Sequence, residues 1–520
     1  MKKLPIGIQS FERLIRDNYI YVDKTALLHQ LITQGKSYFI SRPRRFGKSL
    51  LVSTLKEIFL GNKPLFENMA IAQLPYDWQQ HPVIYLDMSA LDVDSVTSFK
   101  KDLVRELCAI ADTYTIGLED ITSPSAIMRS LIRKLSSINS VAVLVDEYDA
   151  PILKHVTNLR VAEAMREQLR SLYGIFKSMD AHIKFTFLTG ITKFSRTSIF
   201  SGLNNLNDIS TYDEYSGLLG YTQEELEQYF GDYLDAQATI EAIPKKRLLQ
   251  ETKLWYNGYH FSEKSPGMYN PFSILCYLSK KKRENFWFET GTPTFLMQLL
   301  RREHAGIEKL LEGSVTVSTL SSFNIETLPI IPLMFQTGYL TIKEYDAAEK
   351  TYRLGIPNEE VRISLDRYLL ASFAERDVSE VEAYVHDIRR ALEKTDIPLF
   401  FEQLRSLFAH IPYQLHIPQE RYYHSLFQML GTVLGYNIQS EVSTDKGRID
   451  VVFIMKQHVY VFEFKFNSSA AQALEQIEER RYFERYLTAK KAIMLLGVSF
   501  NRTKKSFTIE YAAKAVEHEQ

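Results

Sequence analysis

The sequence predicts an α/β protein in which two sheet-containing regions flank a mainly helical middle module. In the first half, short apolar runs alternate with amphipathic stretches of helical length. This alternation is typical of a parallel sheet covered by helices. From about residue 222 to residue 382 the pattern is mostly helical, and from about residue 416 strands and helices alternate again over short connections.

The apolar runs of the first half have the length of buried strands, and the amphipathic stretches between them have the length of helices. We expect strands at Ser37–Ser41, Val83–Asp87, Val141–Asp146 and Lys184–Leu188, and helices at Leu50–Phe59, Thr97–Ala111 and Val161–Phe176.

Within the helical middle module, two short strand-like pieces, Gly338–Ile342 and Thr351–Leu354, predict a small hairpin or winged element. The linker to the last region is expected at Glu382–Ile417, with the boundary near residue 385. In that region we expect helices at Glu420–Leu434 and Ala470–Tyr486, and strands at Asn437–Glu441, Ile449–Ile454, Val459–Phe464 and Lys491–Leu496. The predicted domains are therefore 1–221, 222–384 and 385–520.

Length and composition agree with this division and exclude several classes. The chain has 520 residues, enough for about three domains, and its 45% hydrophobic and 24% charged residues exclude collagen-like, disordered and coiled-coil proteins. Its two cysteines, Cys108 and Cys276, exclude a disulfide framework and a four-cysteine zinc site. The formal charge of -1 gives no global basic field, so any nucleic-acid surface must be a local patch.

Apolar segments are short throughout. The sequence has no run of about 18 apolar residues that would span a bilayer, and the apolar stretch after the first three residues is too short for a signal peptide. We therefore expect a cytoplasmic protein without a membrane partner.

A phosphate-binding loop is predicted where strand Ser37–Ser41 runs into the segment Arg-Pro-Arg-Arg-Phe-Gly-Lys-Ser at residues 42–49. Gly47 allows a tight turn, Lys48 neutralises β- and γ-phosphate oxygens, and the Ser49 hydroxyl ligates Mg²⁺. The pattern departs from G-x-x-x-x-G-K-[ST] at its first glycine, where Arg42 stands. Arg44 and Arg45 contact either phosphates or a neighbouring subunit, and the sequence leaves both alternatives open.

Two adjacent carboxylates follow the buried strand of residues 141–145. In a P-loop ATPase, Asp146 would hold the water shell of Mg²⁺ and Glu147 would polarise the attacking water. Thr189, at the end of the next strand, stands where such ATPases place a polar residue that senses the γ-phosphate. The competing interpretation of Asp146 and Glu147 is a strand that ends in an acidic turn. Their position about a hundred residues after the loop favours ATP binding.

A second cluster of charged residues is predicted near the C-terminus. Glu463 and Lys465 point to the same face of one strand, and Asp450 on the adjoining strand can meet them. Two carboxylates and a lysine suit metal-dependent phosphodiester cleavage, in which the acids hold Mg²⁺ or Mn²⁺ and the lysine positions or deprotonates water. The alternative is a solvated cross-strand pair.

Two further residues and one aromatic segment are candidates. Gln476 lies on the helix that follows the Glu463 strand and would support the cluster. Glu420 begins a helix, where it either completes the metal shell or satisfies the helix dipole. The segment Trp255–Phe261 either binds a base or forms a packed corner, and the packed corner is favoured.

Short segments spread over nearly the whole chain carry a family resemblance. They are Tyr21–Thr25, Arg42–Ser49, Val145–Pro151, Thr189–Ile191, Trp255–Phe261, Tyr269–Phe272, Phe335–Leu340, Gly447–Asp450 and Glu463–Lys465. On these segments the chain resembles the bacterial AAA-ATPase-like family, which commonly joins its ATPase to a C-terminal nuclease domain of the PD-(D/E)XK superfamily.

The resemblance implies a P-loop ATPase domain and a C-terminal α/β restriction-endonuclease-like domain. It also implies that an arginine in place of the first glycine of the P-loop pattern, here Arg42, is a trait of the family. It also implies metal ligands at Asp450 and Glu463, a catalytic Lys465, and supporting roles for Gln476 and Glu420. The proline of the superfamily name is absent, because Ile449 precedes Asp450.

Three hypotheses of function follow. In the first, the protein binds and hydrolyses ATP, and this reaction gates or drives Mg²⁺-dependent cleavage of DNA or RNA. In the second, it is a nucleotide-dependent switch whose nuclease-like domain recognises nucleic acid or a partner without cutting. A weaker third hypothesis is a simple nuclease whose P-loop is inactivated by Arg42. Ring formation is typical of such ATPases, which makes a homo-oligomer one of the open alternatives.

Overall fold

The computed structural model describes residues 1–118, 123–194, 199–200, 203, 205–287, 314–321, 329–374, 376–409, 420–444, 447–489, 491–502 and 507–516. The described residues form two compact units. The first is drawn from Met1–Leu296 and Leu311–Glu360, and the second continues from Val361. Helix α16 (Glu359–Phe373) begins in the first unit and continues into the second. The division into three domains stays a prediction.

The first sheet is five-stranded and parallel, with the order β2-β3-β4-β1-β5. Strands β1 (Ser37–Ser41), β2 (Val83–Asp87) and β3 (Val141–Asp146) have the predicted bounds, and β4 (Ile183–Gly190) is longer by three residues. The two-residue strand β5 (Asn207–Asp208) was not predicted. Because the strands are parallel, the ends of β1, β3 and β4 meet at one edge of the sheet.

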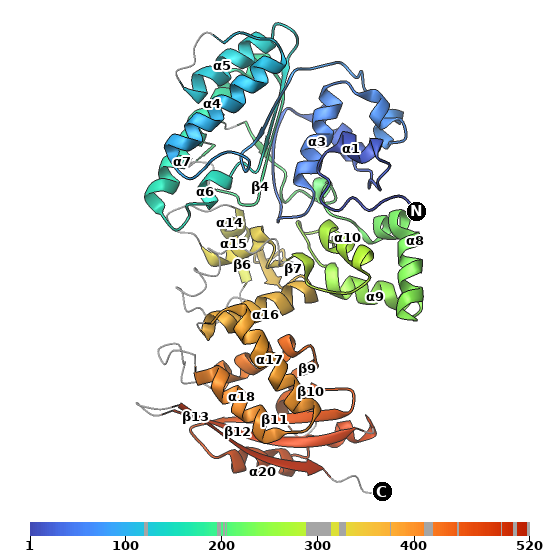
Figure 1. Cartoon of the computed structure of the whole chain (residues 1–520), viewed down its shortest axis with the longest axis vertical. Coiled ribbons are helices and arrows are strands. Elements are labelled where there is room, and N and C mark those ends of the chain that lie inside the picture. The colour runs from blue at the N-terminus through green and yellow to red at the C-terminus, as the bar shows by residue number, and fades with distance from the viewer. Residues whose placement is uncertain are drawn as a thin grey trace. The chain divides into compact units, whose positions relative to one another are not determined.

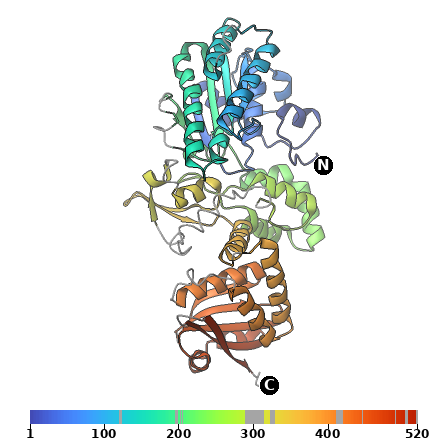
Figure 2. The same cartoon turned by 60° about the vertical axis from the view of Figure 1, so that its left-hand side comes forward.

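Helices cover this sheet on both sides. Figures 1 and 2 show α4, α5 and α7 on one side, and α1 and α3 on the other. Helix α5 was not predicted, although Ser123 caps it and Pro124 opens it. The bounds are α1 Phe11–Arg16, α2 Thr25–Gln34, α3 Lys48–Phe59, α4 Val96–Thr113, α5 Pro124–Leu135, α6 Ala150–Leu153 and α7 Leu159–Ser178.

The rest of the first unit is mainly helical, as predicted, and contains a small antiparallel sheet. The predicted hairpin is formed by β7 (Thr341–Asp346) and β8 (Thr351–Gly355), and β6 (Ser314–Thr316) adds a third strand. The helices are α8 Gln223–Glu241, α9 Lys245–Tyr256, α10 Pro271–Lys280, α14 Val317–Ser321 and α15 Ile330–Thr337. Buried side chains of α8, α9 and α10 form one hydrophobic cluster together with Ile20, Val22 and Phe286.

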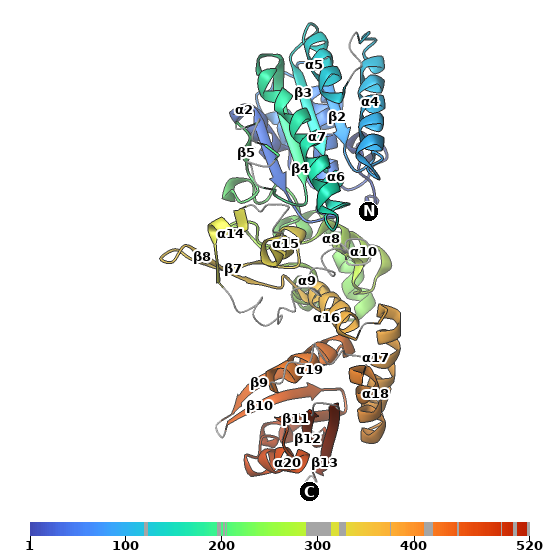
Figure 3. The same ribbon diagram turned by 90° about the vertical axis from the view of Figure 1, so that its left-hand side faces the viewer.

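The second unit contains a five-stranded mixed sheet with the order β13-β12-β11-β10-β9, in which only β11 and β12 run parallel. The sheet is formed by β9 Asn437–Thr444, β10 Gly447–Ile454, β11 His458–Phe466, β12 Ala492–Arg502 and β13 Phe507–Val516. Figure 3 shows α19 (Glu420–Leu434) and α20 (Ala470–Glu479) on opposite faces. These elements agree with the α/β fold predicted for this region.

Strands β9 to β12 are longer than predicted, and the structure differs from the sequence prediction at three further places in this unit. Strand β13 was not predicted. Helix α20 ends at Glu479, because Arg481 adopts a positive φ of 49° that an α-helix excludes. The expected linker instead contains most of helix α17 (Val378–Glu393) and all of helix α18 (Ile397–Ala409), and α18 packs on the sheet through stacked rings of Phe401 and Tyr511.

Within the described ranges, no helix combines the length and the apolar character needed to cross a bilayer.

Candidate functional site

The loop between β1 and α3 contains two residues with positive φ, Arg45 at 69° and Gly47 at 94°. A left-handed backbone is strained at a non-glycine residue such as Arg45. Gly47 is the N-cap of α3, so the helix begins at Lys48. The free amides at the start of a helix attract anions, and the loop therefore has the form of a phosphate-binding loop.

Lys48 lies inside this loop and is only 3% exposed. Its Nζ donates to the carbonyl oxygens of Arg42 at 3.1 Å and Pro43 at 3.3 Å. It also lies 3.3 Å from Oε1 of Glu147, at the end of β3. The predicted phosphate-binding lysine and the predicted water-activating acid are therefore brought together.

Asp146 is completely buried at the end of β3. Its Oδ1 accepts hydrogen bonds from the Thr189 hydroxyl at 3.0 Å and from the Glu147 amide at 3.1 Å. Its buried Oδ2 has no hydrogen-bond partner among the residues that the structure describes. Burial raises the pKa of the Asp146 carboxyl, and the Ser49 hydroxyl opposes that shift. A buried carboxylate oxygen without a donor is costly, so this atom fits a Mg²⁺ ion or a water bound to it.

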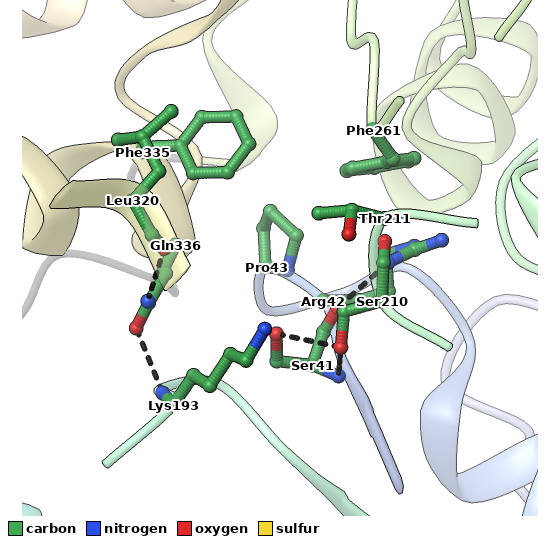
Figure 4. Close-up of a pocket in the computed structure, with 10 residues that line it drawn as sticks. All are labelled: Ser41, Arg42, Pro43, Lys193, Ser210, Thr211, Phe261, Leu320, Phe335 and Gln336. Atoms are coloured by element: carbon green, nitrogen blue, oxygen red, sulfur yellow. Dashed lines mark hydrogen bonds between the residues drawn. The ribbon is translucent and has the colours of Figure 1, made fainter. Parts of the chain in front are cut away.

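Arg42 stands where the P-loop pattern has its first glycine. Its side chain is 1% exposed and packs against residues that lie much later in the sequence. Its guanidinium lies 4.1 Å from the ring centroid of Phe261, and its Nη1 donates to the carbonyl oxygens of Ser41 and Ser210 at 2.9 and 2.6 Å. Figure 4 shows the side chain beneath Phe261 and beside Ser210. Burial lowers the pKa of the Arg42 guanidinium to about 9. Arg42 thus joins the loop to a distant part of the unit.

Arg44 and Arg45 contact the same part of the unit. The carbonyl oxygen of Arg44 accepts a hydrogen bond from the indole Nε1 of Trp287 at 3.1 Å. The guanidinium of Arg45 lies 4.7 Å from the ring centroid of Phe272. Phosphate or subunit contacts of either arginine stay predictions.

The aromatic segment Trp255–Phe261 is a packed corner, as favoured from the sequence. Tyr259 and Phe261 are buried, and their ring centroids lie 4.9 and 5.3 Å from that of Phe46 in the loop. The loop is therefore enclosed by aromatic side chains that are more than 200 residues distant in the sequence.

Beside the loop lies a mainly apolar cleft that sequence reasoning missed. Its cavity volume is about 70 Å³, and it is lined by Gly47 and the first turn of α3 on one side. The other side is formed by two short segments, whose lining residues include Tyr21, Val22, Leu218 and Leu219. The only signal in the sequence was the segment Tyr21–Thr25, which the family resemblance included.

The second group of predicted residues lies on β10 and β11. The pairing of β10 with β11 ends at Val451 and Phe462, and Asp450 and Glu463 are the next residues along these two strands. Oδ2 of Asp450 accepts a hydrogen bond from the Phe464 amide at 2.8 Å. Lys465 Nζ lies 3.3 Å from Oε1 of Glu463, whose side chain is 3% exposed. The structure therefore brings the two acids and the lysine together.

Gln476 reaches this cluster from α20, where its Nε2 donates to Oε1 of Glu463. The helix can pack this closely because Gly497 on β12 has no side chain. A Cβ at Gly497 would lie 2.3 Å from the Ala470 carbonyl oxygen and 2.4 Å from the Leu474 amide nitrogen.

His424 is a neighbour of the cluster that was not predicted as a site residue. Its Nε2 lies 2.7 Å from the carbonyl oxygen of Asp450. The side chain of Glu420, one turn earlier, lies outside the described residues. No group of three or more His, Cys, Asp or Glu side chains that could hold a metal occurs among those that are described. The described donor set, Asp450 and Glu463, supplies two carboxylates of the kind that Mg²⁺ prefers.

Comparisons with known proteins match both regions. The model of the family described as "Predicted AAA-ATPase" matches residues 5–200, and that of the PD-(D/E)XK nuclease superfamily matches residues 418–510. A protein of Azotobacter chroococcum mcd 1, described as "Uncharacterized protein in vnfD 5'region", is 38% identical over 522 residues. That alignment covers 97% of this chain and 98% of the relative.

Proposed function

Because the chain belongs to the family of predicted AAA-ATPases with a C-terminal PD-(D/E)XK nuclease superfamily domain, we propose that it couples ATP hydrolysis to cleavage of nucleic acid. The observation that carries the proposal is the meeting of Lys48, Asp146 and Glu147 at one edge of the first sheet. Asp450, Glu463 and Lys465 supply the second site.

In the proposed nucleotide site, phosphates bind to the amides at the start of α3 and to Lys48. The Lys48 ammonium is held by two neutral carbonyl oxygens and one carboxylate, and phosphate oxygens compete well for it because they carry more charge than carbonyls. Ser49 and the buried Oδ2 of Asp146 would hold Mg²⁺. When bound with ATP, Mg²⁺ supplies neutralisation of charge on the β- and γ-phosphates.

The apolar cleft beside Gly47 would accept the base of the nucleotide. It adjoins the phosphate-binding turn, and its lining of aliphatic and aromatic side chains suits the flat, apolar faces of a base. Glu147, released from Lys48 when phosphate binds, would accept a proton from the attacking water. Thr189 orients Asp146 through the hydrogen bond to its Oδ1.

In the proposed nuclease site, Asp450 and Glu463 would hold a divalent ion, Mg²⁺ or Mn²⁺, with Glu420 as a further ligand. The ion would supply the charge neutralisation that phosphodiester hydrolysis needs. Lys465 would position the attacking water or accept its proton, and Gln476 fixes the orientation of Glu463. The substrate is DNA or RNA.

The test is cleavage of labelled single- and double-stranded DNA and RNA with Mg²⁺ or Mn²⁺, with and without ATP. Lys465→Ala is expected to abolish cleavage under every condition, and Lys48→Ala is expected to abolish only the part that depends on ATP. Cleavage that persists in Lys465→Ala would contradict the nuclease assignment. Cleavage by the wild type that ignores ATP would contradict the coupling.

A second candidate function is a nucleotide-dependent switch whose nuclease-like domain binds nucleic acid or a partner without cutting. One observation favours it: both acids of the C-terminal cluster already accept hydrogen bonds from protein donors, Asp450 from the Phe464 amide and Glu463 from Gln476. Nucleic acid binding that changes with ATP, without cleavage in either metal, would support the switch.

A further inference from the structure

A second buried carboxylate, Asp149, lies two residues after Glu147 and is completely inaccessible to solvent. Its Oδ2 accepts hydrogen bonds from the Thr192 amide at 2.7 Å and from the Thr192 hydroxyl at 2.5 Å. The Ile191 amide lies 3.3 and 3.2 Å from its two carboxylate oxygens. Asp149 therefore joins the turn after β3 to the segment after β4.

Tyr148 joins the same two segments. Its amide donates to the carbonyl oxygen of Thr189 at 2.8 Å, and its hydroxyl donates to the carbonyl oxygen of Thr192 at 3.1 Å. The segments approach so closely at Gly190 that a Cβ there would lie 2.5 Å from the ring of Tyr148 and 2.6 Å from Oδ1 of Asp149. Hydrogen bonds and close packing thus hold the turn after β3 against the segment after β4.

The joined turn and segment position two residues of the proposed ATPase site, Glu147 and Thr189. Glu147 has a positive φ of 49°, a conformation that a non-glycine residue keeps only when its surroundings enforce it. That backbone directs its carboxylate towards Lys48 at 3.3 Å. On the other segment, Thr189 donates to Oδ1 of Asp146 at 3.0 Å.

We propose that Asp149 is a positioning residue for the ATPase reaction, which holds Glu147 and Thr189 in their working arrangement by binding the amides of Ile191 and Thr192. The inference rests on the proposed function, because it needs ATP hydrolysis at this site. Burying a carboxylate is costly, and three donors from one segment compensate for that cost. A neutral side chain offers a weaker acceptor for these donors.

The electrostatic surroundings give the arrangement a pH dependence. Burial raises the pKa of the Asp149 carboxyl to about 6, the negative charge of Glu147 adds to the shift, and the Thr192 hydrogen bonds oppose it. Lys48 also opposes the shift, and the phenols of Tyr148 and Tyr173 also interact with Asp149. As the pH falls through about 6, the carboxyl gains a proton and loses acceptor strength towards the two amides. Wild-type turnover should therefore decline over that range.

The experiment compares Asp149→Asn with the wild type and with Asp87→Asn. Asp87 is a matched control, because it stands at the end of the neighbouring strand β2 and accepts hydrogen bonds from Ser89. For Asp149→Asn we expect turnover to fall by about 10- to 100-fold, as for a small misplacement of a catalytic group. The Kd for a fluorescent ATP analogue should change little, and the decline of turnover near pH 6 should disappear. Asp87→Asn should match the wild type.

Two outcomes would overturn the inference. One is turnover and a pH profile in Asp149→Asn that match those of the wild type. The other is equal loss of turnover, nucleotide binding and thermal stability, which is the result of a purely structural role. If the wild type itself does not hydrolyse ATP, the proposed function fails instead. Hydrogen exchange at the Ile191 and Thr192 amides then still tests the contact, since Asp149→Asn should accelerate it.

Discussion

The Nζ of Lys48 lies 3.3 Å from Oε1 of Glu147, and this contact joins the first residue of α3 to the end of β3. One strand, β4, separates β3 from β1 in the sheet. Because all the strands of that sheet run in one direction, their ends deliver the cation and the acid to the same edge. In this arrangement Glu147 would compete for the same ammonium group with a phosphate bound at the proposed nucleotide site.

That competition leads to the first prediction. Glu147→Gln should bind ATP at least as tightly as the wild type, because an amide competes less well than a carboxylate for Lys48. Its turnover should fall by about 10²- to 10⁴-fold, as expected for loss of a general base. A fluorescent ATP analogue measures the binding, and phosphate release measures the turnover.

Lys48→Ala is the matched variant, and it should lose nucleotide binding as well as turnover. Weaker ATP binding in Glu147→Gln would show that Glu147 does not compete for Lys48. Full turnover in that variant would show that another group activates the water.

The second prediction concerns Gly190, at the end of β4. An alanine there would place its Cβ 2.5 Å from the ring of Tyr148, and such overpacking of a buried site destabilises by about 1 to 3 kcal/mol. Urea denaturation of Gly190→Ala should therefore show a lower free energy of unfolding for the first unit.

Gly174→Ala is the control, because Gly174 lies inside α7 and its Cβ would meet nothing within 4 Å. Replacing a helical glycine by alanine should stabilise by about 0.5 to 1 kcal/mol. If both variants were destabilised equally, close packing at Gly190 would not be the cause.

The sequence predicted the parts of the fold that depend on local pattern. Strands β1, β2 and β3 have their predicted bounds, because their runs of three to five consecutive apolar residues identify buried parallel strands. The two-residue strand β5 is too short to show any pattern.

In the candidate site, too, the sequence predicted the residues that follow from local pattern and missed those that depend on distant partners. Lys48, Asp146 and Glu147 were found because their positions follow from strand ends. Phe261, the partner of Arg42, stands more than 200 residues away, so the sequence alone contained no signal for the contact. Asp149 was not predicted as a site residue, because its partners Ile191 and Thr192, which follow β4, become its neighbours only when β3 and β4 pair.

A third prediction tests how α20 places Gln476 in the C-terminal cluster. Gly497→Ala would put its Cβ 2.3 Å from the Ala470 carbonyl oxygen, so the helix must move away from β12. The variant should lose both stability and cleavage. Gln476→Ala removes the amide while α20 stays packed, so it should reduce cleavage by about tenfold or more and leave the melting temperature nearly unchanged. Full cleavage by Gly497→Ala would show that the position of α20 does not matter.

The fourth prediction concerns Glu360, a completely buried acid at the start of α16. Its Oε2 accepts a hydrogen bond from the Ser273 hydroxyl at 2.7 Å, and its Oε1 accepts one from the Trp287 amide at 2.9 Å. Burial raises the pKa of the Glu360 carboxyl from 4.5 to about 7. Between these two values the folded protein binds more protons than the unfolded chain, so raising the pH through this range lowers the free energy of unfolding.

A pKa raised by that much contributes about 3 kcal/mol to the free energy of unfolding at low pH. Most of this contribution should be lost between about pH 5 and pH 8. Glu360→Gln does not titrate, so its stability relative to the wild type should rise over the same range. All three tryptophans, Trp78, Trp255 and Trp287, lie in the first unit, and their fluorescence during urea denaturation therefore reports on that unit. Glu67→Gln, at an exposed position, should keep the pH dependence of the wild type. If Glu360→Gln also kept the pH dependence of the wild type, the loss of stability with rising pH would arise from other acids. Glu360 would then ionise in the folded protein as easily as in the unfolded chain.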